Sequence, residues 1–385
     1  MSTLTIPRYG EASLADVGPS LLSALGVAGE RDVLGLGELQ RAVLFLVDGL
    51  GWNQLQANRD VAPYLASMGG RSLTAGFPAT TVSSLASVAT GLPSGQHAMT
   101  GYSSYVEEIG AVVNWLAWRP VGEGGDIRDR LVPEVVQPLP TVWERAERAG
   151  IATTICTYDN FAETGLTRAV LRGGRWGGTY TEGDAIARAA EASEQGHRSL
   201  VYVYVSALDL VGHMRGPDTD AWRGQLAIVD RIAAELARRL PPEATLFVTA
   251  DHGMVHVPDE VKIDADATPS LLDGVIALAG EPRARYVHVA PGAADDVFAT
   301  WREVLGETWQ VLRRDDAITA GLFGPVVTTA ARARIGDIVA LSLASGGVVE
   351  RRRLPRLSAM PGQHGSVTGD ELLVPLLQSI AGSSR

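Results

Sequence analysis

The chain contains 385 residues, of which 46% are hydrophobic and 20% are charged, and this composition indicates a globular protein with a sizeable buried core. The same composition excludes a disordered, collagenous or coiled-coil protein. The formal net charge is −11, and the sequence has no Lys/Arg-rich tail. We therefore expect it to bind neither a nucleic-acid polymer nor an anionic membrane.

The sequence also bears on membrane spans, signal peptides and disulfide bonds. The longest apolar runs are far shorter than the roughly 20 residues that span a bilayer. Residues 1–20 lack the basic region and the apolar region of a signal peptide. Cys156 is the single cysteine, so an intramolecular disulfide cannot form. We expect a cytoplasmic protein without a membrane span, and its oligomeric state stays open.

Strands and helices are predicted to alternate along the first 250 residues. Continuous apolar runs, which are typical of strands covered on both faces, predict strands at residues 41–48, 151–157, 200–206 and 244–251. Helical periodicity predicts helices at residues 141–149, 181–192 and 220–240. This alternation favours an α/β fold with a largely parallel sheet. Its ligand site should lie at the carboxyl ends of the strands.

The composition shifts after residue 257. Strands predicted at 285–290 and 336–343, with a helix at 294–305 between them, indicate a smaller inserted domain. The alternative is that these elements extend the main sheet. The first interpretation divides the chain into a core of residues 1–257 and 354–385 and a cap of residues 258–353.

Acidic residues and histidines follow two of the predicted strands. Asp48 precedes a glycine, and an Asp in that position is as often a turn or N-cap residue. Asp251 and His252 lie in the sequence TADHGM. Adjacent strand residues point to opposite faces, so both can reach one ion only beyond the end of the strand. Such a pair suits zinc or another divalent metal.

Two further groups could hold a metal. Asp209 and His213 are four residues apart and share one face of a helix, although an isolated pair of this kind is more often a surface hydrogen bond. His364 lies in the Gly/Pro-rich loop MPGQHGSVTGD, where a histidine is usually exposed. The joint occurrence of these groups in a chain with only seven histidines favours metal binding.

A segment rich in small hydroxyl residues predicts a helix with threonines at its N-terminus. Residues 80–97 read TTVSSLASVATGLPSGQH, and the apolar spacing predicts a helix that begins near Val82 and ends at Gly91 and Pro93. Thr80 and Thr81 precede it, where a hydroxyl is ordinarily a cap. Free N–H groups at that end would also donate to a phosphoryl oxygen, so a nucleophile fits the same geometry.

Together, these motifs resemble the alkaline phosphatase superfamily, most closely its type I phosphodiesterase/nucleotide pyrophosphatase branch. The resemblance rests on five motifs in the family's order: DG at 48–49, TTVSSLASVATGLPSGQH at 80–97, DLVGH at 209–213, ADHGM at 250–254 and GQHG at 362–365. It implies an alkaline phosphatase-like α/β sandwich with a largely parallel central sheet flanked by helices. The insert before the last histidine matches a cap region found in the family.

The resemblance also implies two divalent metal ions, with zinc as the first choice and manganese as the alternative. It assigns one ion to Asp48, Asp251 and His252 and the other to Asp209, His213 and His364. The nucleophile would be Thr81 rather than Thr80, because the family's threonine lies ten residues before the glycine of its TG pair, here Gly91.

One position departs from the family pattern. Nucleotide pyrophosphatases have an asparagine three residues after the nucleophile that contacts a phosphoryl oxygen, and this chain has Ser84 there. Ser84 is thus predicted to contact a phosphoryl oxygen, but the departure weakens a specific assignment as a nucleotide pyrophosphatase.

The implied activity is hydrolysis of a phosphodiester or pyrophosphate bond in a small phosphorylated molecule or nucleotide, through a phosphothreonine intermediate. A phosphomonoesterase and a phosphonate C–P hydrolase would use the same metal core. The alternative from another class is a non-catalytic metal- or nucleotide-binding module.

The sequence predicts the substrate pocket only weakly. Aromatic and amide residues that either line it or pack in the core are Tyr102, Tyr105, Asn114, Trp115, Tyr158 and Phe161. A basic run either meets an anionic substrate or forms a solvated edge; its members are Arg351, Arg352, Arg353 and Arg356.

Overall fold

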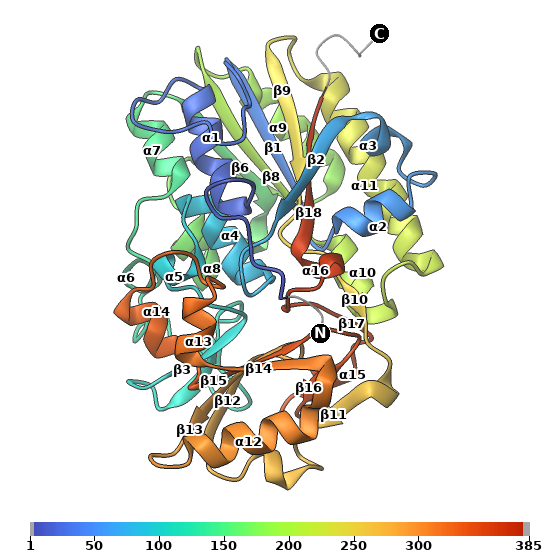
Figure 1. Cartoon of the computed structure of the whole chain (residues 1–385). Coiled ribbons are helices and arrows are strands. Elements are labelled where there is room, and N and C mark those ends of the chain that lie inside the picture. The colour runs from blue at the N-terminus through green and yellow to red at the C-terminus, as the bar shows by residue number, and fades with distance from the viewer. Residues whose placement is uncertain (1–3, 380–385) are drawn as a thin grey trace.

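The computed structural model describes residues 4–379, and a seven-stranded sheet with helices on both faces forms its larger part (Figure 1). In spatial order the strands are β2 (Gly69–Thr74), β18 (Leu373–Gln378), β9 (Ala244–Thr249), β1 (Arg41–Val47), β8 (Ser199–Val205), β6 (Ala152–Tyr158) and β7 (Arg175–Thr179). The five strands from β9 to β7 are parallel, whereas β18 is antiparallel to both of its neighbours. The predicted α/β fold with a largely parallel sheet is confirmed.

Burial on both faces explains the apolar runs of the central strands. Every residue of β8 is buried, as is every residue of β1 except Arg41. Helices α9 (Glu182–Ser193) and α11 (Asp220–Arg239) form one layer, and α1 (Val17–Ala24), α4 (Thr81–Thr90) and α7 (Val142–Arg148) pack together in the other (Figure 1). No helix within residues 4–379 has the length and apolar character needed to cross a membrane.

A separate four-stranded antiparallel sheet lies within residues 258–353. Its order is β12 (Val275–Glu281), β13 (Ala284–Val289), β15 (Ile338–Ser342) and β14 (Trp309–Arg313). Helix α12 (Ala294–Leu305) covers it and buries Trp301 in an apolar cluster with Leu278 and Ile338. This sheet shares no strand with the seven-stranded sheet, and the domain bounds drawn from the sequence stay a prediction.

A small three-stranded sheet connects the two regions. Strands β3 (Ser103–Val106), β4 (Ala111–Asn114) and β5 (Arg119–Pro120) follow α4 in the chain and were not predicted from the sequence. The Ser103 hydroxyl donates to the Gly280 carbonyl at 2.8 Å, and the Tyr286 hydroxyl donates to the Thr100 carbonyl at 2.8 Å. The chain that follows α4 is thereby fixed against residues 258–353.

His97 supports α4 from behind in its neutral form. Its Nδ1 accepts the Met99 N–H at 3.1 Å, so Nε2 carries the proton and donates to the Ser87 hydroxyl at 3.1 Å. Burial, followed by the charge of Arg334, lowers the pKa of His97 to about 3. Protonation of His97 would break the bond to Met99.

This histidine predicts an acid sensitivity of folding. Its folded pKa of about 3 lies below the unfolded value of 6.5, so its contribution is complete above pH 6.5 and is lost as the pH falls toward 3. Between pH 6.5 and 5 we expect metal-free protein to lose about 2 kcal/mol through His97. His97→Gln should be less stable at pH 7 but should lose less on acidification. Urea unfolding in EDTA tests this, and an equal acid loss in both proteins would contradict it.

Candidate active site

Three neighbouring parallel strands place ligand-type side chains at one edge of the sheet. Asp48 directly follows β1, Asp251 and His252 follow β9, and α10 (Ala207–Arg215) begins just after β8. Because the spatial order is β9, β1, β8, the carboxyl ends of these strands meet. The structure brings these residues together at the carboxyl ends of the strands, where the sequence predicted the ligand site.

Gly49 allows the end of β1 to approach α10. Its φ is +76°, and a Cβ there would lie 2.9 Å from the Cα of Asp209. The Gly49 N–H donates to Asp251 Oδ1 at 3.1 Å, and the His252 N–H donates to the same oxygen at 3.0 Å. These two bonds orient Asp251, and its Oδ2 has no hydrogen-bond partner in the described part of the chain.

The first ligand group lies around His252. Its Nε2 is 3.4 Å from Asp48 Oδ1 and 3.5 Å from Asp251 Oδ2, and both oxygens are buried without a hydrogen-bond partner among residues 4–379. The Tyr204 hydroxyl, on β8, donates to the other oxygen of Asp48. One ligand atom each from Asp48, Asp209 and His252 lie within 4.8 Å of one another.

The second ligand group is formed by Asp209, His213 and His364, whose ligand atoms also lie within 4.8 Å of one another. Asp209 Oδ1 is 3.4 Å from His213 Nε2, so the spacing of four residues puts both on one face of α10. His364 Nε2 is 3.2 Å from His213 Nε2. Asp209 belongs to both groups, whereas the family resemblance assigned it to one.

Backbone carbonyls set the tautomers of all three histidines. A carbonyl only accepts, so Nδ1 of His252 donates to Gly253 O at 2.8 Å and Nδ1 of His213 donates to Gly362 O at 2.8 Å. In the same way, Nδ1 of His364 donates to Ala79 O at 2.9 Å. Each unprotonated Nε2 therefore faces the carboxylates, as a metal-binding imidazole requires.

The electrostatics of this cluster fit divalent cations. Burial, and then the charges of Asp251 and Asp209, raise the pKa of Asp48 well above its usual range. Burial, and then His252 and His213, lower the pKa of His364 well below its usual range. Buried carboxylates with unpartnered oxygens are compensated by a cation. Three carboxylates and three Nε2 atoms are a donor set for two divalent ions of the zinc or manganese type.

Thr81 contacts this cluster through its hydroxyl group. It is the first residue of α4, and its Oγ1 is 3.2 Å from the unprotonated Nε2 of His252, to which it donates. Thr80 is the N-cap with extended backbone, and it lines the larger cavity beside Thr81. Ser84 is buried one turn further along α4, and its hydroxyl has no partner within the described chain.

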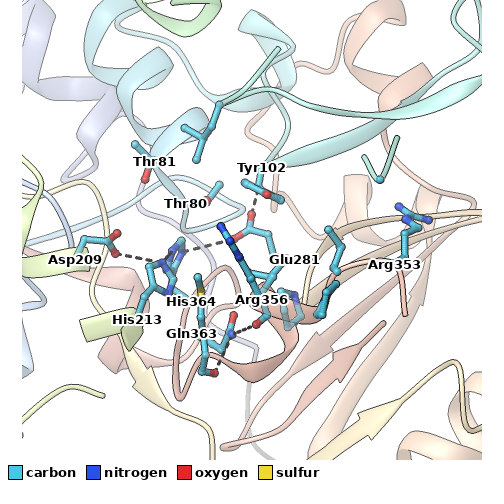
Figure 2. Close-up of a pocket in the computed structure, with 17 residues that line it drawn as sticks. Thr80, Thr81, Tyr102, Asp209, His213, Glu281, Arg353, Arg356, Gln363 and His364 are labelled. Atoms are coloured by element: carbon cyan, nitrogen blue, oxygen red, sulfur yellow. Dashed lines mark hydrogen bonds and ion pairs between the residues drawn. The ribbon is translucent and has the colours of Figure 1, made fainter. Parts of the chain in front are cut away.

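Two cavities meet at Thr81. The larger, of about 500 Å³, extends from Thr81 and His364 to Arg353 and Arg356 (Figure 2). The smaller, of about 260 Å³, has an apolar wall that includes Leu85, Phe161, Leu166 and Val170. Thr81, Asp209 and Leu116 line both cavities.

The structure separates the predicted pocket residues. Tyr102 lines the larger cavity and accepts a bond from Asn114 at 2.6 Å. Phe161 lines the smaller cavity and packs edge-on against Tyr158. The other four line neither cavity. Asn114 and Tyr158 contact the two lining residues, Trp115 is fully buried and donates to Ser104, and Tyr105 lies beside His288 at another cavity.

The basic run is also divided. Arg351 pairs with Asp259 at 2.9 Å and with Asp264 at 3.7 Å, outside the larger cavity. Arg352 is exposed and also lies outside it. Arg353 and Arg356 line the larger cavity, so the solvated-edge interpretation describes only the first half of the run.

Two residues at the site were missed from the sequence. Glu281 ends β12, is 4% exposed, accepts the Tyr102 N–H at 3.3 Å and lies 3.5 Å from Nδ1 of His364. Burial raises its pKa to about 8. Nothing local in the sequence marks it. Tyr204 was detectable, because a tyrosine in the buried run LVYVYV needs a partner for its hydroxyl.

Comparison with known proteins identifies the family. The Type I phosphodiesterase / nucleotide pyrophosphatase family matches residues 42–367. The chain belongs to this family. It is therefore a hydrolase of the phosphodiesterase/pyrophosphatase family with a candidate metal site, as its motifs indicate.

Solved structures share its fold. An inactive variant of murine ectonucleotide pyrophosphatase/phosphodiesterase 5 in complex with AMP is 16% identical, with a TM-score of 0.68 over 89% of this chain and 88% of that chain. Phosphonoacetate hydrolase from Sinorhizobium meliloti in complex with phosphonoformate is 19% identical, with a TM-score of 0.65 over 88% and 89%. A phosphopentomutase of Sinorhizobium fredii is 29% identical over 172 residues. The match spans 41% of that relative's length.

The two ligand groups predict how many metal ions each ligand variant retains. After zinc reconstitution we expect about two ions per chain. Asp48→Asn and His364→Ala should each retain about one ion and the double variant none, because they remove ligands from different groups. Asp209→Asn should weaken both sites. Elemental analysis after desalting measures the content, and a double variant that still binds one ion would show that both residues serve one site.

Proposed function

We propose that this protein hydrolyses a phosphodiester or pyrophosphate bond of a small phosphorylated molecule or nucleotide, using two divalent metal ions. The observation that carries this proposal is the position of Thr81 at the junction of two cavities. A phosphoryl group at Thr81 can extend one substituent into each cavity, whereas a monoester fills only one. The AMP complex of the murine relative supports a nucleotide as one substituent.

The side chains define the roles in this reaction. The Thr81 hydroxyl attacks phosphorus, the first ester oxygen leaves, and water then hydrolyses the phosphothreonine and restores the hydroxyl. The N–H groups at the start of α4 face the phosphoryl oxygens. Tyr204 and three backbone carbonyls hold the ligand side chains in place. The metal ions, when bound, stabilise the threonine alkoxide and the charge on the phosphoryl oxygens.

Zinc is the proposed metal because imidazole and carboxylate ligands suit it, with manganese as the alternative. The cytoplasmic location stays an expectation that rests on the single cysteine, Cys156.

The nucleophile assignment is tested by a matched pair of variants. Thr81→Ala should abolish turnover of bis(p-nitrophenyl) phosphate while keeping its metal, because the Asp and His ligands are intact. Thr80→Ala should retain most activity, since it is the Thr81 hydroxyl that contacts His252. Thr81→Ser should keep partial activity. Acid trapping should place phosphate on residue 81, and a phosphopeptide that maps to residue 80 would refute the assignment.

The two cavities predict a preference for diesters. We expect kcat/KM for bis(p-nitrophenyl) phosphate to exceed that for p-nitrophenyl phosphate by about tenfold, or ~1.4 kcal/mol, because the second arm is bound and one fewer charge meets the carboxylates. Assays with added zinc and manganese measure both values. A monoester value that is about tenfold higher would overturn this preference. Turnover of phosphonoacetate alone would indicate a C–P hydrolase, and metal binding without any turnover would indicate a binding module.

A further inference from the structure

The larger cavity runs from the metal ligands to a basic wall. Thr81, Asp209 and His213 line this cavity, and so do Arg353 and Arg356 (Figure 2). A substituent of the phosphoryl group that enters this cavity therefore extends toward two guanidinium groups.

The two arginines are engaged differently. Arg353 pairs with Glu350 at 3.1 Å and donates to the Leu278 carbonyl at 3.1 Å, so it is already held by the protein. Arg356 lies on α15 (Pro355–Ala359), and its side chain is directed into the cavity (Figure 2). Within residues 4–379 its guanidinium makes neither a hydrogen bond nor an ion pair. Arg356 is thus free to bind a ligand group.

The helix that carries Arg356 is fixed rather than loose. The Lys262 ammonium, whose side chain is 2% exposed, donates to the Ser358 and Met360 carbonyls at 3.0 and 3.1 Å. The buried Gln363 amide donates to the Leu357 and Met360 carbonyls at 2.9 and 3.1 Å. Gln363 directly precedes His364, so α15 is tied to the metal-ligand loop. This anchoring reduces the entropy lost when Arg356 binds a ligand.

A buried carboxylate, Glu281, also lines this cavity, and it forms no ion pair with Arg356 within residues 4–379. Glu281 is 4% exposed and accepts the Tyr102 N–H. A planar guanidinium without a partner matches a carboxylate or phosphate, which it binds through two parallel N–H bonds.

We propose that Arg356 binds a second anionic group, a phosphate or a carboxylate, on the substituent that occupies the larger cavity. This inference rests on the proposed function and specifies its substrate class. The preferred substrates carry an anionic arm, as a pyrophosphate does, rather than a neutral ester arm.

Kinetics with a charged and a neutral arm test this assignment. The ratio of kcat/KM for ATP to that for bis(p-nitrophenyl) phosphate should fall by about tenfold or more in Arg356→Ala and less in Arg356→Lys. Arg352→Ala is the matched control, because Arg352 is an exposed arginine of the same run that lies outside the cavity. Its ratio should equal that of the wild type.

Binding provides a readout that does not depend on turnover. In zinc-loaded Thr81→Ala protein, calorimetry compares phosphonoacetate with methylphosphonate, which lacks the carboxylate. Adding Arg356→Ala should weaken phosphonoacetate binding by about tenfold and leave methylphosphonate binding within about twofold.

Equal weakening of both ligands, or of neither, would overturn the role of Arg356, and so would an unchanged kinetic ratio. Failure of the proposed function looks different. The wild type would then turn over neither diesters nor pyrophosphates, while the two calorimetric affinities would still decide whether Arg356 binds the anionic group.

Discussion

The rest of the site depends on the gathering of three carboxylates at the ends of β9, β1 and β8. Asp48, Asp209 and Asp251 each keep a buried oxygen that has no hydrogen-bond partner in the chain from residue 4 to residue 379. Such desolvated like charges cost several kcal/mol each unless cations compensate them. The protein must therefore hold its ligands against their own repulsion. It does so with fully buried central strands and with hydrogen bonds from backbone groups that cannot move independently of the sheet.

The last ligand, His364, comes from the far end of the chain and needs a separate anchor. Glu371 accepts the Ser366 N–H at 3.0 Å and two bonds from the Arg283 guanidinium at 2.8 and 2.7 Å. Both side chains of this ion pair are fully buried, and Arg283 lies in the turn between β12 and β13. Removing one partner of such a pair is strongly destabilising. The loop that carries His364 is thus fixed to residues 258–353 as well as to the main sheet.

The strands and site residues that local sequence patterns encode could be predicted. Continuous apolar runs gave the strands that carry Asp48 and Asp251, and parallel strand ends brought those residues together. Strand β18 was not predicted because its Pro375 cannot donate a backbone hydrogen bond to a neighbouring strand. Strand β2 was not predicted because its first residues are exposed glycines. Glu281 reaches the site only through long-range packing of β12 beside β3, which no local pattern encodes.

The two cavities explain how one metal core can serve different substrates. The ligands follow the central strands, lie on α10 or, for His364, come from the loop after β17 (Gly362–Gln363), whereas much of the cavity lining comes from other segments. Residues 353–364 line the larger cavity, and α8 (Gly165–Val170) and Phe161 line the smaller one. Leu116, in the loop after β4, touches both. Substitutions in α15 or α8 can therefore change which arms are accepted without disturbing the phosphoryl position, because neither helix supplies a metal ligand.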